Sequence, residues 1–262
     1  MNEIDFGTAF KALTGYPPFP WQSDLYDTWF ALGKFPPSCN LPTGLGKTSV
    51  IAIWLIALAN GKPVPRRLVY VVNRRTVVDQ TTDEVEKYVR PLAHNGPPYL
   101  PILLDLSEKL RSITSEPTAD PLALSTLRGQ FADNREWSAD PSRPAVICGT
   151  VDMIGSRLLF SGYGLGRYDR TQQVGLLGCD TLLVHDEAHL TDPFQQLLDT
   201  IVCEQAKERT AGWGLKVMAL TATSRHRENQ SVPFRLTEKD ESNPVVVERL
   251  DAAKTITLHT VK

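Results

Sequence analysis

The sequence is short of cysteine, of basic charge and of long apolar runs, and each shortage argues against a class of protein. Its four cysteines form no C-x-x-C pair and lie far apart, which argues against a zinc site or a disulfide framework. The net charge of −2 gives no overall positive field, so nucleic-acid binding needs a local basic patch. The longest apolar run, residues 50–59, is about half as long as a membrane-spanning helix requires.

The N-terminus also lacks the pattern of a secretory signal, because Glu3 and Asp5 precede any apolar stretch. We therefore expect a cytoplasmic protein with no membrane partner. The content of 42% hydrophobic and 22% charged residues is typical of a globular chain with one large domain. We place that domain at residues 1–230, followed by a tail or linker at 231–262.

Apolar runs of two kinds alternate along the chain. Short runs predict strands at 38–41, 68–72, 145–148, 181–184 and 215–220. Longer runs predict helices at 47–60, 75–89 and 151–160, and a further helix that ends near Glu208. This alternation predicts an α/β fold with a mostly parallel sheet and helices on both faces. Loops are predicted at 112–121 and 133–144, and short β-like pieces in the tail at 245–247 and 255–258.

Residues 41–48 (LPTGLGKT) join the first predicted strand to the first predicted helix, which is the context of a phosphate-binding loop. Gly44 and Gly46 permit a tight turn and a close approach of the backbone to a phosphate. The N–H groups of the loop favour an anion, Lys47 adds positive charge for the β- and γ-phosphates, and Thr48 offers a hydroxyl to Mg²⁺. The predicted nucleotide-binding residues are Thr43, Gly44, Leu45, Gly46, Lys47 and Thr48.

One feature of this loop leaves room for another interpretation. The general pattern begins with glycine at the position that Leu41 occupies here. The alternative is a chance occurrence of the same letters in a surface turn.

A second motif, DEAH at 186–189, follows the predicted strand 181–184. Carboxylates at the carboxyl end of a parallel strand lie where such sheets bind ligands. We expect Asp186 to hold Mg²⁺ and Glu187 to orient or deprotonate the attacking water. The alternative is that the two acids begin a helix, whose dipole favours them there. His185 is predicted to be a buried, neutral imidazole with one hydrogen bond.

A third motif, TAT at 221–223, ends the predicted strand 215–220, and on its own it indicates only a turn. Taken in order, PTGLGKT, DEAH and TAT resemble the first motor domain of a superfamily-2 helicase of the DEAD/DEAH-box type. The resemblance covers residues 15–225 approximately and implies a RecA-like P-loop NTPase domain that uses ATP and Mg²⁺. More narrowly, residues 16–22, 68–80 and 147–164 resemble the CRISPR-associated helicase-nuclease of type I interference systems, in the subtype with a C-terminal HD domain.

The resemblance also assigns roles to single residues. It implies a catalytic set of Lys47, Asp186 and Glu187, and a glutamine, Gln22, that reads the adenine edge. A solvent-facing helix residue is an equally open interpretation of Gln22. The resemblance implies contacts with the nucleic-acid backbone at Asn73, Arg74, Arg75 and Thr150, with added charge from Arg157 and Arg167. Each arginine is alternatively a solvated surface charge. Coupling to a partner domain is implied for His189, Thr221 and Thr223.

Two components of such a helicase are missing from the sequence. The residues after 223 are too few for a second motor domain, and the five histidines form no HD nuclease cluster. We expect a piece of a longer protein that binds ATP weakly, hydrolyses it poorly and does not unwind duplex alone. The implied partners are single-stranded DNA, an RNA-guided CRISPR surveillance complex, a second motor domain and an HD nuclease domain. The competing hypotheses are a P-loop NTPase switch without a nucleic-acid role and an inactive helicase remnant.

Overall fold

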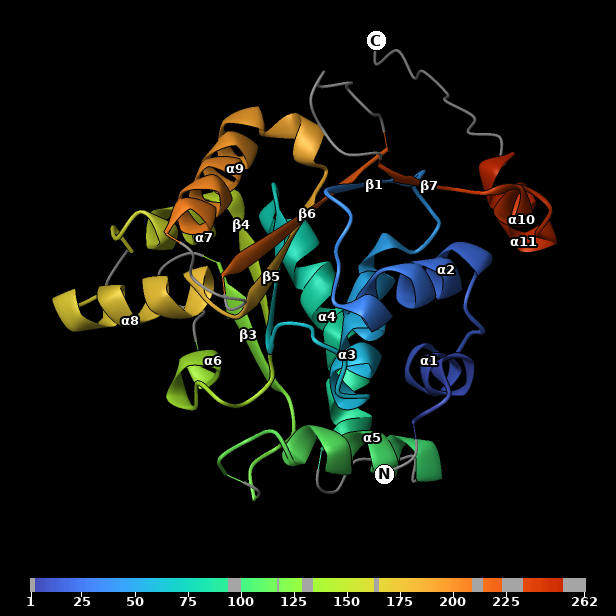
Figure 1. Cartoon of the computed structure of the whole chain (residues 1–262), viewed down its shortest axis with the longest axis horizontal. Helices are drawn as coiled ribbons and strands as arrows, with labels where there is room; N and C mark the ends of the chain where they lie inside the picture. Colours follow the sequence, from blue (N-terminus) through green and yellow to red (C-terminus); the bar gives the residue numbers. More distant parts are fainter. Residues whose placement is uncertain are drawn as a thin grey trace, which may run out of the picture.

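The computed structural model describes residues 3–93, 100–116, 118–128, 134–162, 165–208, 214–222 and 233–251. Its centre is a seven-stranded parallel sheet with the order β3-β4-β2-β5-β6-β1-β7 (Figure 1). The strands are β1 Ser38–Asn40, β2 Arg67–Val72, β3 Ala123–Leu127, β4 Ala145–Thr150, β5 Thr181–Asp186, β6 Leu215–Thr221 and β7 Phe234–Arg235. The predicted α/β class with a parallel sheet is therefore confirmed.

Helices cover both faces of the sheet, as predicted (Figure 1). One group comprises α1 Phe6–Thr14, α2 Pro20–Thr28, α3 Val50–Ala59, α4 Arg75–Leu92 and α5 Pro101–Arg111. The other comprises α6 Glu136–Ala139, α7 Val151–Leu158, α8 Arg167–Gly178 and α9 Asp192–Lys207. The short helices α10 Glu238–Glu241 and α11 Pro244–Leu250 lie beyond β7, and 3₁₀ turns cover η1 Phe30–Leu32, η2 Lys47–Ser49 and η3 Ala188–Leu190.

Alternating side chains of the central strands supply two hydrophobic cores. In β2, Leu68, Tyr70 and Val72 join the core under α1 to α5, whereas Val69 and Val71 join the core under α6 to α9. All ten residues of α3 are buried, because α1, α2, α4 and α5 surround it on one side of the sheet. This double coverage explains why the strands and α3 are apolar without interruption.

Several elements differ from the sequence predictions. The helix predicted from Lys47 begins with the 3₁₀ turn η2, and α-helix starts at Val50. The strands β3 and β7 and the helices α1, α2, α5, α8 and α10 were not predicted, and α6 lies within the predicted loop 133–144. The β-like interpretation of residues 245–247 is wrong: Pro244 opens α11, and the Asn243 side chain caps it by accepting from the N–H groups of Val245 and Val246. Residues 255–258 lie outside the described residues.

The division into a domain at 1–230 and a tail at 231–262 stays a prediction. Phe234–Arg235 forms the edge strand β7, which pairs with β1. No helix in the described part of the chain is long and apolar enough to cross a membrane.

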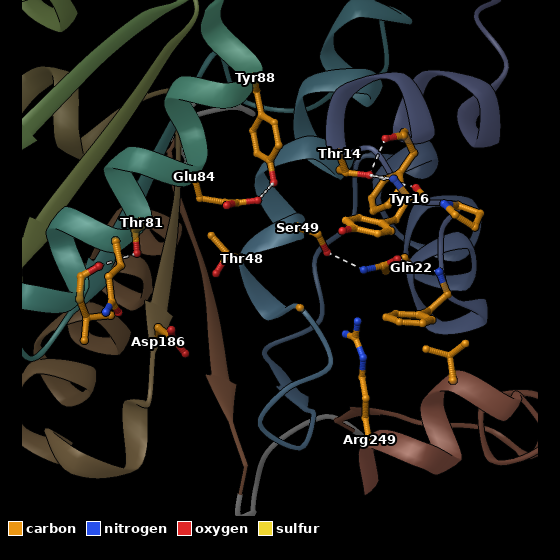
Figure 2. A pocket seen from close by; sticks show the side chains of 17 residues that line it. Thr14, Tyr16, Gln22, Thr48, Ser49, Thr81, Glu84, Tyr88, Asp186 and Arg249 are labelled. Atoms are coloured by element: carbon orange, nitrogen blue, oxygen red, sulfur yellow. Dashed lines mark hydrogen bonds between the residues drawn. The ribbon is translucent and has the colours of Figure 1, made fainter. Parts of the chain in front are cut away.

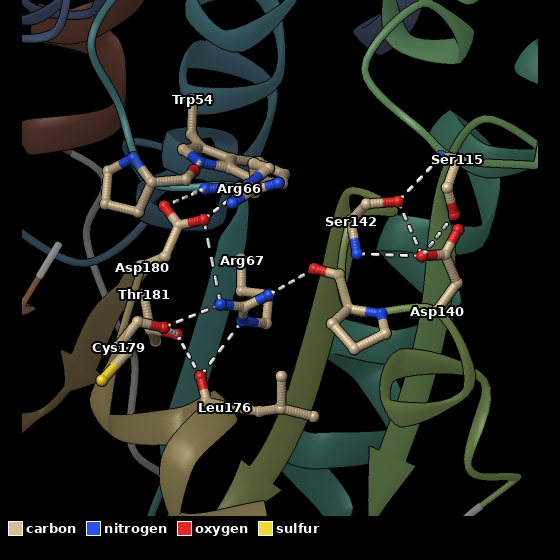
Figure 3. A network of polar contacts seen from close by, with 12 residues as sticks. Trp54, Arg66, Arg67, Ser115, Asp140, Ser142, Leu176, Cys179, Asp180 and Thr181 are labelled. Atoms are coloured by element: carbon tan, nitrogen blue, oxygen red, sulfur yellow. Dashed lines mark hydrogen bonds and ion pairs between the residues drawn. The ribbon is translucent and has the colours of Figure 1, made fainter.

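The two edges of the sheet differ in character. At the carboxyl edge, a cavity of about 510 Å³ opens between α1, α2, α4 and the loop after β1 (Figure 2). At the amino edge, a polar network joins Arg67 of β2 to the carbonyl groups of Pro141, Leu176 and Cys179 (Figure 3). The acidic partner of this network is Asp180, which forms an ion pair of 2.5 Å with Arg66. In the described residues, polar contacts thus close the amino edge around Arg67, and a cavity lies at the carboxyl edge.

Candidate functional site

The phosphate loop lies between β1 and η2 and has the backbone that its glycines predict. Gly44 has φ +88° and Gly46 has φ +73°, both in the left-handed region that favours glycine. Leu41 and Leu45 are completely buried. Leu41, at the position where the general pattern has glycine, also donates its N–H to the Thr221 carbonyl at 3.0 Å. The departure from the pattern thus anchors the loop in the core, while Thr43, Gly44 and Gly46 are exposed. The phosphate-binding role of the loop stays a prediction.

The strand order brings the acidic motif to this loop. β5 and β1 both pair with β6, so their carboxyl ends lie at the same edge of the sheet. The Nζ atom of Lys47 lies 2.9 Å from Oε1 of Glu187, although the two residues are 140 positions apart. Lys47 is buried and Glu187 is partly exposed. This ion pair joins the cation of the loop to the predicted general base.

Asp186 is held by a tyrosine that the sequence analysis did not single out. The Tyr70 hydroxyl donates to Oδ2 of Asp186 at 2.9 Å, and the Glu187 N–H donates to Oδ1 at 2.9 Å. Burial, followed by the nearby Asp186 carboxylate, raises the pKa of Tyr70 well above its usual range, so the hydroxyl stays protonated. The signal for Tyr70 in the sequence is a single hydroxyl within the apolar run LVYVV.

The donor set fits Mg²⁺. Thr48 and Asp186 line the same cavity, which offers a ligand a hydroxyl and a carboxylate oxygen from two elements. Burial raises the pKa of Asp186, while the Tyr70 hydrogen bond and Lys47 lower it. Within the described ranges no group of three or more His, Cys, Asp or Glu side chains is placed to hold a metal. A set with one carboxylate suits Mg²⁺, which binds proteins through one or two carboxylates plus phosphate oxygens.

The alternative interpretation was that the two acids of the motif begin a helix. The structure shows no α-helix directly at the motif. Glu187 has φ +51°, and only a 3₁₀ turn follows before α9 starts at Asp192. His189 Nδ1 lies 3.5 Å from Oε2 of Glu187 and 3.2 Å from Oγ1 of Thr221. His189 thus lies between Glu187 and Thr221, and the coupling role of His189 and Thr221 stays a prediction. The third, Thr223, lies outside the described residues.

His185 is buried between two polar partners. Its Nδ1 lies 2.8 Å from Oε1 of Gln195, and its Nε2 lies 2.9 Å from Oγ1 of Thr191. Burial lowers the pKa of His185, which favours the predicted neutral imidazole, and the ring has two polar partners where one hydrogen bond was predicted. Thr191 in turn donates to Oδ1 of Asn73 at 3.0 Å. The sequence analysis did not single out Thr191 or Gln195, the two partners of His185.

Gln22 is buried, with 3% of its surface exposed, so the interpretation as a solvent-facing residue is wrong. Its Nε2 donates to Oγ of Ser49 at 2.7 Å, and its Oε1 accepts from the Phe19 N–H at 2.7 Å (Figure 2). An amide group has two hydrogens and two lone pairs, so each end keeps one for a ligand. Gln22 lines the cavity together with Gly46, Thr48 and Asp186. Its role as a reader of adenine stays a prediction.

The predicted nucleic-acid contacts divide into exposed and buried residues. Arg74 and Arg75 are exposed at the carboxyl end of β2. Thr150 is buried at the end of β4, where its hydroxyl accepts from the Met153 N–H and caps α7.

The two additional arginines also differ in exposure. The interpretation of Arg157 as a surface charge is wrong: it is 3% exposed, and its Nε donates to Oε1 of Gln173 at 2.7 Å. Arg167 is exposed. Sequence reasoning missed Arg128, an exposed residue that follows β3 and pairs with Asp79.

Comparison with known proteins adds a family and a fold. The sequence profile of the family described as type III restriction enzyme, res subunit (ResIII), matches residues 16–226. No curated protein sequence matches the chain. Among solved structures, T. fusca Cas3 bound to AMPPNP is 18% identical with a TM-score of 0.51, over 83% of this chain and 22% of that chain.

Two further structures are similar. T. fusca Cas3 is 18% identical with a TM-score of 0.50, over 83% of this chain and 22% of that chain. The Pyrococcus furiosus Hef helicase domain is 18% identical with a TM-score of 0.48, over 92% of this chain and 37% of that chain. At these identities the similarity concerns the fold, and the predicted RecA-like architecture is confirmed. The chain spans 22% of the length of T. fusca Cas3.

Proposed function

Because the chain belongs to the family described as type III restriction enzyme, res subunit, and is a helicase-type motor domain of superfamily 2, we propose that it binds ATP and Mg²⁺ and turns over ATP as part of a nucleic-acid motor. The observation that carries the proposal is the 2.9 Å contact between Lys47 and Glu187. It joins the phosphate loop to the acidic motif across the carboxyl edge of the sheet, where parallel sheets bind ligands.

The residues of the site have distinct tasks in this proposal. Lys47 exchanges its partner Glu187 for the β- and γ-phosphates, and the N–H groups near Gly44 and Gly46 surround those phosphates. The freed Glu187 carboxylate then orients the attacking water and accepts its proton. Thr48 and Asp186 would hold Mg²⁺, which neutralises charge on the phosphoryl oxygens when bound.

We further propose that the nucleic-acid substrate is single-stranded DNA and that it contacts the carboxyl ends of β2, β3 and β4. Arg74 and Arg75 lie after β2, and Arg128 lies after β3. Both strands are neighbours of β4 in the sheet. Exposed guanidinium groups at one sheet edge suit the phosphate backbone of a strand.

The fold shared with T. fusca Cas3 supports a finer proposal. In it, the chain acts in CRISPR type I interference in the cytoplasm, within a parent protein that adds a second motor domain and an HD nuclease domain. The RNA-guided surveillance complex is then its recruiting partner. The isolated chain is expected to bind ATP weakly, to hydrolyse it poorly and not to unwind duplex, because superfamily-2 motors need a second domain to complete the nucleotide site.

The test is ATP turnover by the purified chain and by the parent protein, each with and without single-stranded DNA. Glu187→Gln should lower turnover by about a hundredfold or more, because it removes the general base. Glu108→Gln, an exposed change of the same kind on α5, serves as the control and should leave turnover unchanged.

Each competing function has its own outcome in this assay. Turnover by the parent protein that single-stranded DNA does not stimulate would favour the NTPase switch. Turnover that is absent, or equal in Glu187→Gln and in the unmodified chain, would favour the inactive remnant.

A further inference from the structure

The segment after β7 returns to the phosphate loop. Nη1 of Arg249, on α11, donates to the Gly44 carbonyl at 2.8 Å, although the two residues are 205 positions apart. The guanidinium carbon of Arg249 also lies 5.1 Å from the centre of the Phe19 ring. Arg249 and Phe19 line the same cavity as Gln22 and Thr48 (Figure 2). A residue from the predicted tail thus forms part of the wall of the candidate nucleotide site.

The helices that carry Arg249 are fastened to the body of the domain. The buried Asp240 accepts the N–H of Trp21 in α2 at 2.7 Å and the N–H of Thr237 at 2.9 Å. Val246 of α11 is completely buried. Arg249 is therefore held next to α2, the helix that also positions Gln22.

The contacts of Arg249 suit a flat, unsaturated ring better than a phosphate. Its guanidinium lies over an aromatic ring, and such planar groups stack on π-systems on both faces. The group that Arg249 contacts on the phosphate loop is a carbonyl, which accepts a hydrogen bond and repels phosphate oxygens. Gly46 and Thr48 of the phosphate loop line the same cavity, and the adjacent Lys47 is the proposed cation for the phosphates. What remains to be held next to Phe19 is the base of the nucleotide.

We propose that Arg249 and Phe19 form the stacking site for the nucleotide base, with the Gly44 carbonyl fixing the guanidinium. α11 then belongs to the nucleotide site, and Arg249 contributes to the affinity for a nucleoside triphosphate through its base. This inference rests on the proposed function, because it assigns the base end of the same site.

The experiment measures the binding of two probes to the 262-residue chain by titration calorimetry with Mg²⁺. One probe is ATP, and the other is inorganic tripolyphosphate, which has the phosphates without the base. Arg249→Gln should raise the Kd for ATP about tenfold and leave the Kd for tripolyphosphate unchanged. Arg249→Lys keeps the positive charge but replaces the planar guanidinium with an ammonium group, and it should give a smaller loss of ATP affinity. Lys239→Gln, on the neighbouring helix α10, removes the same charge from an exposed position and should change neither Kd.

The outcomes separate this inference from the function on which it rests. Lys47→Ala should weaken the binding of both ATP and tripolyphosphate. An unchanged Kd for both probes in this variant would contradict the proposed function itself. If Lys47→Ala behaves as expected, three results overturn the base-stacking role: unchanged ATP affinity in Arg249→Gln, equal weakening of both probes, or the same loss in Lys239→Gln. Thermal unfolding of each variant checks that it folds. Should Arg249→Gln fail that check, Arg249→Lys decides, and unchanged ATP affinity in it overturns the role.

Discussion

Replacing Arg67 by methionine should destabilise the fold strongly without touching the candidate site. Arg67 is buried at the amino end of β2, and its guanidinium donates to three carbonyls at 2.8–3.0 Å (Figure 3). Hydrogen bonds from a charged group contribute about 1.5–3 kcal/mol each, but burial of the guanidinium offsets part of that sum. Burial also lowers the pKa of Arg67, because a charged guanidinium loses hydration when it is removed from water.

The contacts that survive the substitution limit the loss. The Thr181 hydroxyl lies 2.8 Å from the Leu176 carbonyl and 3.1 Å from the Cys179 carbonyl, so these two share its single hydrogen after the substitution. Asp180 keeps its ion pair with Arg66. We therefore expect Arg67→Met to lower the free energy of unfolding by about 3 kcal/mol, at the low end of the range for breaking a buried charged network.

The assay is urea unfolding followed by circular dichroism, with Arg66→Met as the matched control. The side chain of Arg66 is 32% exposed, so solvent screens its ion pair and the expected loss is about 1 kcal/mol or less. A loss below about 1 kcal/mol for Arg67→Met, or equal losses for the two variants, would refute the reasoning.

Three further predictions concern the site. Tyr70→Phe removes a hydrogen bond that lowers the pKa of Asp186, so that pKa should rise and the acid limb of the ATP turnover profile should move to higher pH; an unmoved limb in a pH series would contradict this role. Burial holds the pKa of His185 below its ordinary 6.5, so its neutral form stabilises the fold above pH 6.5 and that contribution is lost as the pH falls further; His185→Gln should flatten the fall in urea-unfolding free energy below pH 6.5, and an unchanged slope would count against it. Gly44→Ala should cost about 1–2 kcal/mol because of its φ of +88°, and should weaken ATP binding in the same titration used for Arg249; full stability in thermal melts would contradict the left-handed geometry.

The parts of the fold that could be predicted are those in which one local pattern decides the structure. The run Leu68–Val72 is apolar because both faces of β2 are covered, so composition alone identified the strand. The glycines of the phosphate loop could be read because only glycine adopts φ values such as +88° at little cost. The meeting of Lys47 with Glu187 followed from the rule that parallel strands end at one edge of the sheet.

The parts that escaped prediction depend on long-range contacts. β3 is a five-residue strand whose burial alternates, and it ends the described sheet with β4 as its neighbour. An arginine is usually found at the surface, but Arg157 is buried and donates to the Gln173 side chain of α8. The hydrogen bond from Arg249 to Gly44 joins residues that are 205 positions apart, and no local pattern around either residue indicates it.

The burial of Leu41 and Leu45 ties two properties of the molecule together. Both leucines are part of the loop that surrounds the candidate phosphate site, and both are completely buried. A close-packed interior transmits small changes in volume over neighbouring contacts. Heating that loosens this interior should therefore weaken the proposed binding of a nucleoside triphosphate before the chain unfolds. Substitutions that repack the core around the two leucines should change nucleotide affinity and Tm in the same direction.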